Sequence, residues 1–78
     1  MSTKFVCACV DGFTNILEQQ VVEYNSDISL LQAYLFWFEQ NCYPFDTSIL
    51  REDPMEAIEQ LKTAAFDCET NISVIAID

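Results

Sequence analysis

The side chains best suited to bind charged groups are four acids near the middle of the chain, Glu52, Asp53, Glu56 and Glu59. On a helix, residues three or four positions apart are neighbours, with Cβ atoms about 5–6 Å apart. Phosphates along a nucleic-acid strand have a comparable spacing, so such carboxylates could occupy a basic groove built for nucleic acid. The alternative is a solvated helix start, where each acid contributes about 0.3–1 kcal/mol through the helix dipole.

Two further acids and two aromatic residues complete the candidate partner-binding set. Glu18 and Glu23 belong to an expected strand, where residues five positions apart point to opposite faces, so only one of them serves a given face. Tyr34 and Trp37, like Phe36 between them, lie in an unusually apolar helical segment, and exposed aromatic side chains commonly anchor the centre of an interface. The set is therefore Glu52, Asp53, Glu56, Glu59, Glu18, Glu23, Tyr34 and Trp37.

Catalytic chemistry finds little support in the composition. The chain contains no histidine, which removes the commonest general base and the usual partner of a nucleophilic serine or cysteine. With a single glycine, neither a phosphate-binding P-loop nor a dinucleotide fingerprint is possible. Residues Asp11 to Asn15 lack the alternating acidic ligands of a calcium loop. We therefore expect no enzymatic activity and no cofactor.

The four cysteines are expected to be reduced and structural. Cys7 and Cys9 are separated by one residue, which is not the C-x-x-C spacing of zinc or redox sites, and no histidine could complete a ligand set. The N-terminus has no long apolar run typical of a signal peptide. The expected location is the cytoplasm, where thiols stay reduced. Buried thiols are the leading interpretation and a metal or redox role is the alternative.

The net charge constrains the partner more than any motif does. Thirteen acidic residues against three basic ones give −10 over 78 residues. Direct binding to nucleic acid or to an anionic membrane is disfavoured, because both surfaces are negative. A basic surface on a nucleic-acid-binding protein is the favoured partner, although acidity can also serve solubility alone. The length fits one compact domain, residues 1–78.

The first half of the chain predicts a hairpin followed by a helix. Residues 4–10 read as an apolar strand, Asp11-Gly12 signals a turn that is tight or extends to Asn15, and residues 15–24 read as a half-exposed edge strand. A helix is expected over residues 27–43, capped by Asp27 or Ser26 and ended by Pro44. Its buried stripe is predicted at Leu31, Tyr34, Leu35, Phe38 and Cys42.

This helix carries more apolar surface than one face can bury, so a second helix, a second copy or a partner must cover the rest. The second helix is expected from Pro54 to about Phe66, with Asp53 and Glu56 forming a capping box. Its inward-facing residues are expected to be Met55, Ala57, Ile58, Leu61 and Ala65. Residues 71–78 are rich in β-branched side chains and read as the likeliest interior strand.

The resulting order is β-β-α-α-β, an α+β fold with a three-stranded antiparallel or mixed sheet and both helices on one face. If the last strand pairs with the first, the N-terminal strand is central. The other sheet face would then be open, and its apolar residues would favour a homodimer or a partner.

In length, acidity and lack of catalytic residues, the whole chain resembles the small phage proteins that disable host defences, of which anti-CRISPR proteins that mimic DNA are the best known. That resemblance implies a non-enzymatic inhibitor in the host cytoplasm that binds a basic nuclease complex such as a CRISPR effector. Residues 57–78, AIEQLKTAAFDCETNISVIAID, also resemble the last helix and strand of barstar-type ribonuclease inhibitors. The hairpin in the first thirty residues departs from that family. An immunity protein or antitoxin against a nuclease, or a self-associating accessory subunit, remain the alternatives.

Overall fold

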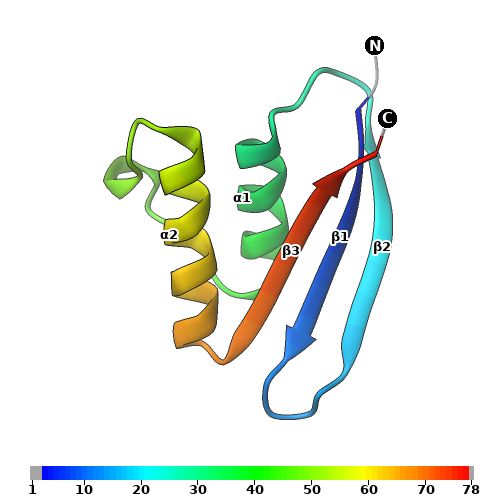
Figure 1. The fold of residues 1–78 in the computed structure, drawn as a ribbon, viewed down its shortest axis with the longest axis vertical. Helices are drawn as coiled ribbons and strands as arrows, with labels where there is room; N and C mark the ends of the chain where they lie inside the picture. The colour runs from blue at the N-terminus through cyan, green and yellow to red at the C-terminus, as the bar shows by residue number, and fades with distance from the viewer. Residues whose placement is uncertain (1–2, 78) are drawn as a thin grey trace.

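Three antiparallel strands and two α-helices follow one another in the order β-β-α-α-β (Figure 1). The computed structural model describes residues 3–77. The strands are β1 (Thr3–Asp11), β2 (Leu17–Tyr24) and β3 (Thr70–Ala76), and the helices are α1 (Leu30–Asn41) and α2 (Pro54–Asp67), with a 3-10 turn at Thr47–Ile49. The predicted fold class and element order are confirmed, and both helices pack on one face of the sheet.

The sheet order is β2-β1-β3, so the N-terminal strand is central and pairs with both neighbours. Its side chains alternate, with Phe5, Cys7 and Cys9 buried beneath the helices. The interpretation of the C-terminal strand as the interior one was wrong, since β3 lies at an edge. Residue Asp78 of that predicted strand lies outside the described residues. The edge position predicted for the second strand is confirmed.

The hairpin loop is the longer of the two predicted alternatives and spans residues 12–16. The Asp11 Oδ1 atom accepts the Phe13 N–H at 2.8 Å, and Asn15 adopts a left-handed conformation with φ of 57°. The Gly12 N–H donates to the Glu69 carbonyl at 2.7 Å, which joins this loop to the turn before β3. A Cβ atom at position 12 would lie 2.5 Å from that oxygen, so only glycine permits the close approach.

Helix α1 begins later than predicted, and its cap is neither Asp27 nor Ser26. The Ser29 hydroxyl accepts the Gln32 N–H, and the Gln32 side chain accepts the Ser29 N–H, both at 3.1 Å, which is a capping box. The Thr3 side chain holds the preceding turn, because its hydroxyl donates to the Ser26 carbonyl at 2.6 Å and accepts the Ile28 N–H. The turn therefore continues past Asp27, and the helix begins only at Leu30.

Most of the excess apolar surface of α1 is covered within the chain, while Phe36 stays 44% exposed. One side of the helix faces β1 and β3, and another side packs against α2. The buried side chains are Ala33, Tyr34, Trp37 and Phe38. The Trp37 indole N–H donates to the Ala8 carbonyl at 2.8 Å and so fixes α1 over the central strand. A second helix, a second copy and a partner were the three predicted alternatives for burying this surface, and the structure shows the second helix.

Helix α2 has proline at its first position, as predicted, but the predicted capping box is absent. The Asp53 side chain makes no cap hydrogen bond, while its carbonyl accepts the Ala57 N–H at 2.9 Å. Ala57, Ile58, Leu61 and Ala65 are buried against α1 and β3. Met55 was predicted to face inward and is instead 64% exposed. Met55 lies in the first turn of α2, beside the buried stripe and not within it.

The sheet face opposite the helices is the open sheet face. It is defined by the strand positions that alternate with the buried ones: Lys4, Val6, Ala8, Val10, Leu17, Gln19, Val21, Glu23, Asn71, Ser73 and Ile75. Leu17, Val21 and Ile75 are each at least 58% exposed. No helix or strand within residues 3–77 covers this face.

Candidate functional site

A groove lies between α2 and the segment that joins the two helices, residues 43–51, and has a volume of about 540 Å³. Its apolar wall comes from Tyr43, Phe45, Ile49 and Ala64. Its polar lining comes mainly from one stripe of α2, namely Glu56, Glu59, Gln60, Thr63 and Asp67, together with Arg51 from the segment. We call this feature the acidic groove, because three of its lining side chains are carboxylates.

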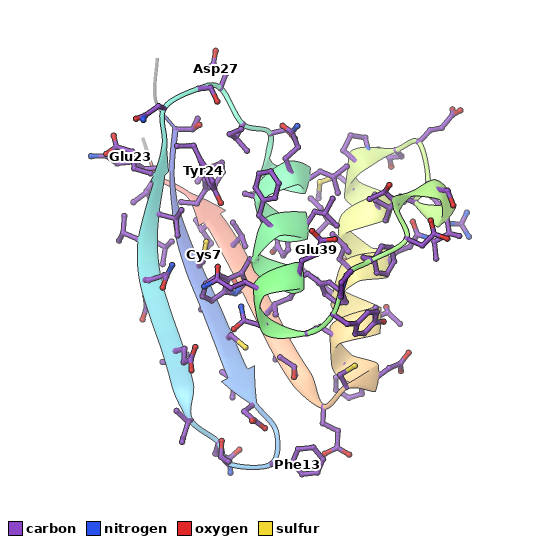
Figure 2. The ribbon with its side chains drawn as sticks, turned by 180° about the vertical axis from the view of Figure 1, so that it is seen from behind. Cys7, Phe13, Glu23, Tyr24, Asp27 and Glu39 are labelled. Carbon is purple, nitrogen blue, oxygen red and sulfur yellow. The ribbon has the colours of Figure 1, made fainter. Side chains whose placement is uncertain are left out.

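The wall of the acidic groove is held in place by aromatic packing. Phe38, fully buried in α1, makes edge-to-face contacts with both Tyr43 and Phe45, with ring centroids 5.1 and 5.4 Å apart. The Phe45 N–H also donates to the Glu39 carboxylate at 3.1 Å. Figure 2 labels Glu39, which lies on α1 beside this segment. The wall is thus an extension of the core.

The rest of the segment is tied to α2 and to itself. The Gln60 side chain donates to the Ile49 carbonyl at 3.0 Å and accepts the Arg51 N–H at 2.7 Å. The Asp46 carboxylate accepts hydrogen bonds from the Ser48 hydroxyl and N–H, which lower the pKa of Asp46. These contacts give the groove a defined shape even though much of its wall is exposed.

The four predicted acids near residue 55 are all exposed, and the fold brings two of them into the acidic groove. Glu56 and Glu59 line it, while Glu52 and Asp53 precede α2 at its N-terminal end. The Glu59 carboxylate lies 3.8 Å from the Lys62 amine, but both side chains are exposed, so this pair contributes at most about 1 kcal/mol. The negative charge at this end of α2 is therefore only partly compensated.

The fold does not bring Glu18 and Glu23 to the acidic groove. Both belong to β2, whereas α2 packs against α1 and β3. Glu18 pairs in register with Cys9 on the helix-facing side, and Glu23 pairs with Lys4 on the open sheet face. Figure 2 shows Glu23 at the outer edge of the sheet, away from α1. The predicted opposite phase of the two residues is confirmed.

The prediction that Tyr34 and Trp37 are exposed anchors was wrong. Tyr34 is 5% and Trp37 3% exposed, because α1 is enclosed by the sheet on one side and α2 on another. The Lys62 amine lies 5.7 Å from the centroid of the Tyr34 ring, and its side chain shields that ring from solvent. Phe36 is 44% exposed, and its ring is tilted against that of Tyr24, with the ring centroids 5.7 Å apart.

The aromatic wall and the acid Asp67 are absent from the set of residues predicted for the site. The expected elements place Tyr43 at the end of the first helix and leave Phe45 and Asp67 outside any helix or strand. The helical spacing of Glu56, Thr63 and Asp67 could have placed these three side chains on one stripe. Nothing local in residues 43–51 indicates which surface that segment packs against, so the wall itself had no sequence signal.

The acidic groove can accept a cationic side chain together with its aliphatic stem. Lysine and arginine place their methylene groups on apolar surface while the charged end stays among polar groups. Here the aromatic wall would contact the stem and the carboxylates of Glu56, Glu59 and Asp67 would face the charge. Arg51 also lines the acidic groove, and its positive charge offsets part of the negative charge of the three carboxylates. The groove therefore attracts a bound cation less strongly than three uncompensated carboxylates would.

The thiols differ in their burial. Cys7 and Cys9 lie in the core, where burial raises the pKa of both, and the nearby carboxylates of Glu18 and Asp11 raise that of Cys9 further. Figure 2 shows Cys7 on the side of β1 that faces α1. Burial also raises the pKa of Cys42, whereas Cys68 is exposed at the end of α2. Within residues 3–77, no group of histidine, cysteine or acidic side chains is arranged to hold a metal.

We expect iodoacetamide at mildly alkaline pH to alkylate Cys68 first in the folded protein and Cys42 more slowly. Cys7 and Cys9 should react at least about 100-fold more slowly, because only their thiolates react and global unfolding must expose them. Mass spectrometry of digested samples measures each site, and labelling in guanidinium, where all four thiols should react alike, is the control. Rapid labelling of Cys7 in the folded protein would contradict the structure.

Comparisons with protein-family models, with curated proteins and with solved structures found no match to this chain. No helix among the described residues has the length and apolar character needed to cross a membrane.

Proposed function

We propose that this chain is a non-enzymatic inhibitor that binds a basic, nucleic-acid-binding surface of a partner protein, in the manner of phage proteins that mimic DNA. The acidic groove carries the proposal, because it combines three carboxylates with an aromatic wall on a chain of net charge −10. Proteins that bind nucleic acid expose arginine and lysine side chains, and these are the groups for which such a groove is suited.

Charge has two separate roles in the proposed complex. The overall charge of −10 would accelerate the encounter with a basic surface over several ångströms, an effect that falls as salt screens it. Local contacts at Glu52, Asp53, Glu56, Glu59 and Asp67 would then determine which basic surface is held. An apolar wall beside these acids distinguishes the site from a merely solvated helix face, because it offers stem contacts that salt does not screen.

The direct test combines capture with competition. Tagged protein is incubated with a cell lysate at low salt, eluted with a salt step, and the eluate is identified by mass spectrometry. Each recovered protein is then purified with labelled nucleic acid bound, and this chain is added. We expect a nucleic-acid-binding protein, such as a nuclease or CRISPR effector complex, to release its nucleic acid. Capture without displacement, or no basic partner at all, would contradict the proposal.

A further inference from the structure

Among the residues that the structure describes, no other element covers the open sheet face. Three strands spaced about 4.8 Å apart, with a rise of about 3.4 Å per residue, give it dimensions of roughly 15 by 25 Å. Leu17, Val21 and Ile75 are at least 58% exposed there, and Val6 and Val10 lie between them in the register.

The open sheet face is also electrically unlike the rest of the molecule. Of the strand positions that form it, only Lys4 and Glu23 are charged, and they are direct partners across β1 and β2. Their charges therefore offset each other, and the remaining polar residues, Gln19, Ser73 and Asn71, are neutral. A chain with a net charge of −10 thus presents one face with no net charge.

We propose that the open sheet face binds the same face of a second copy of this chain, forming a two-fold symmetric dimer. A second copy is the favoured occupant because its own face is equally apolar and equally neutral, whereas a basic partner would gain no charge contact here. Two sheets packed face to face lie about 10 Å apart with their inner side chains interdigitated. The proposal is independent of the function proposed above.

The net charge of each copy determines whether added salt strengthens or weakens the dimer. Each copy carries ten excess negative charges, so the two copies repel one another at long range. Salt screens that repulsion, and the dimer should therefore tighten as ionic strength rises. A complex with a basic partner should instead weaken. Opposite salt dependences would separate the two interfaces in one preparation.

The dimer would leave both acidic grooves accessible. Each acidic groove lies on the helix layer, on the opposite side of its own sheet from the open sheet face (Figure 1). Two such sheets packed together would direct the two grooves away from each other. The assembly could then engage two basic sites at once, which raises the overall affinity without any new contact in either site.

The test measures the oligomeric state of the full chain by sedimentation equilibrium from about 10 μM to about 1 mM at low and high salt, a range suited to a weak interface of this size. We expect a monomer–dimer equilibrium that tightens with salt. Val21→Glu and Ile75→Glu, each at an exposed position of the face, should weaken dimerisation at least about 10-fold by burying a charge in an apolar contact.

The matched control is Phe66→Glu, which adds the same charge at a side chain that is 74% exposed on α2. It should leave dimerisation within about 2-fold of the unmodified chain. Circular dichroism establishes that each variant is folded. A chain that stays monomeric at the highest concentration would overturn the proposal, as would a dimer that survives both sheet substitutions or that Phe66→Glu weakens equally. A dimer that persists in both sheet variants would indicate that the two copies pair through the edge of β2 or β3 instead.

Discussion

Replacing Phe38 by alanine is expected to lower the free energy of unfolding by about 3–5 kcal/mol. The Phe38 side chain is fully buried, and its ring contacts Tyr43 and Phe45 edge to face. Removing it leaves a cavity that the surrounding core only partly fills. The total free energy of unfolding of a domain of 78 residues is about 4–12 kcal/mol, so this single change removes a large part of it.

The matched control for this variant is Phe36→Ala, two residues earlier in the same helix. Phe36 is 44% exposed, so the same truncation should cost only about 1 kcal/mol, mainly through its contact with Tyr24. Urea denaturation followed by circular dichroism gives both values, with an unchanged slope against denaturant as the sign of two-state unfolding. Equal costs for the two variants would mean that α1 is rotated from its position in this structure.

Phe38 also connects stability to the proposed site. Since its ring supports Tyr43 and Phe45, its loss should loosen the wall of the acidic groove. Binding of a basic partner should therefore weaken in Phe38→Ala even at temperatures where the variant remains folded, while Phe36→Ala should bind normally.

Reversing Glu56 and Glu59 to lysine is expected to weaken binding of the basic partner by about 100-fold, or about 2.7 kcal/mol. Each reversal adds two positive charges, which takes the net charge from −10 to −6 and places two lysines against the basic partner. The fold should survive, because both side chains are exposed. The lost dipole interaction at the first turn of α2 and the Glu59–Lys62 pair together cost about 1–2 kcal/mol of stability.

The control reverses Glu18 and Asp27, which gives the same net charge of −6 from two exposed residues that do not line the acidic groove. Figure 2 shows Asp27 in the turn between β2 and α1. Titration calorimetry at low and moderate salt should show only a few-fold loss for this control, through the weaker long-range field. Equal losses in the two double variants would mean that net charge, and not the groove, carries recognition.

Local sequence patterns were enough to predict the elements of this fold. An apolar run in residues 4–10 and a β-branched run in residues 71–78 indicate strands, and Pro54 marks the start of α2, because these signals depend on residues within a few positions of one another. The cap of α1 shows the limit of such signals. Asp27 and Ser29 are both good caps, and the Thr3 hydroxyl, 23 residues from Ser26, decides between them by holding the turn.

Charge, the three strands and two helices, and the four acids around the start of α2 all follow from local features of the sequence. The tertiary structure alone decided which apolar residues are buried. Trp37 and Phe36 are neighbours in an apolar helix, yet one bonds to β1 and the other is exposed, because the position of the sheet and of α2 determines which sides of α1 are covered. The acidic groove likewise exists only where residues 43–51 pack against α2, a contact between separate segments that local periodicity does not encode.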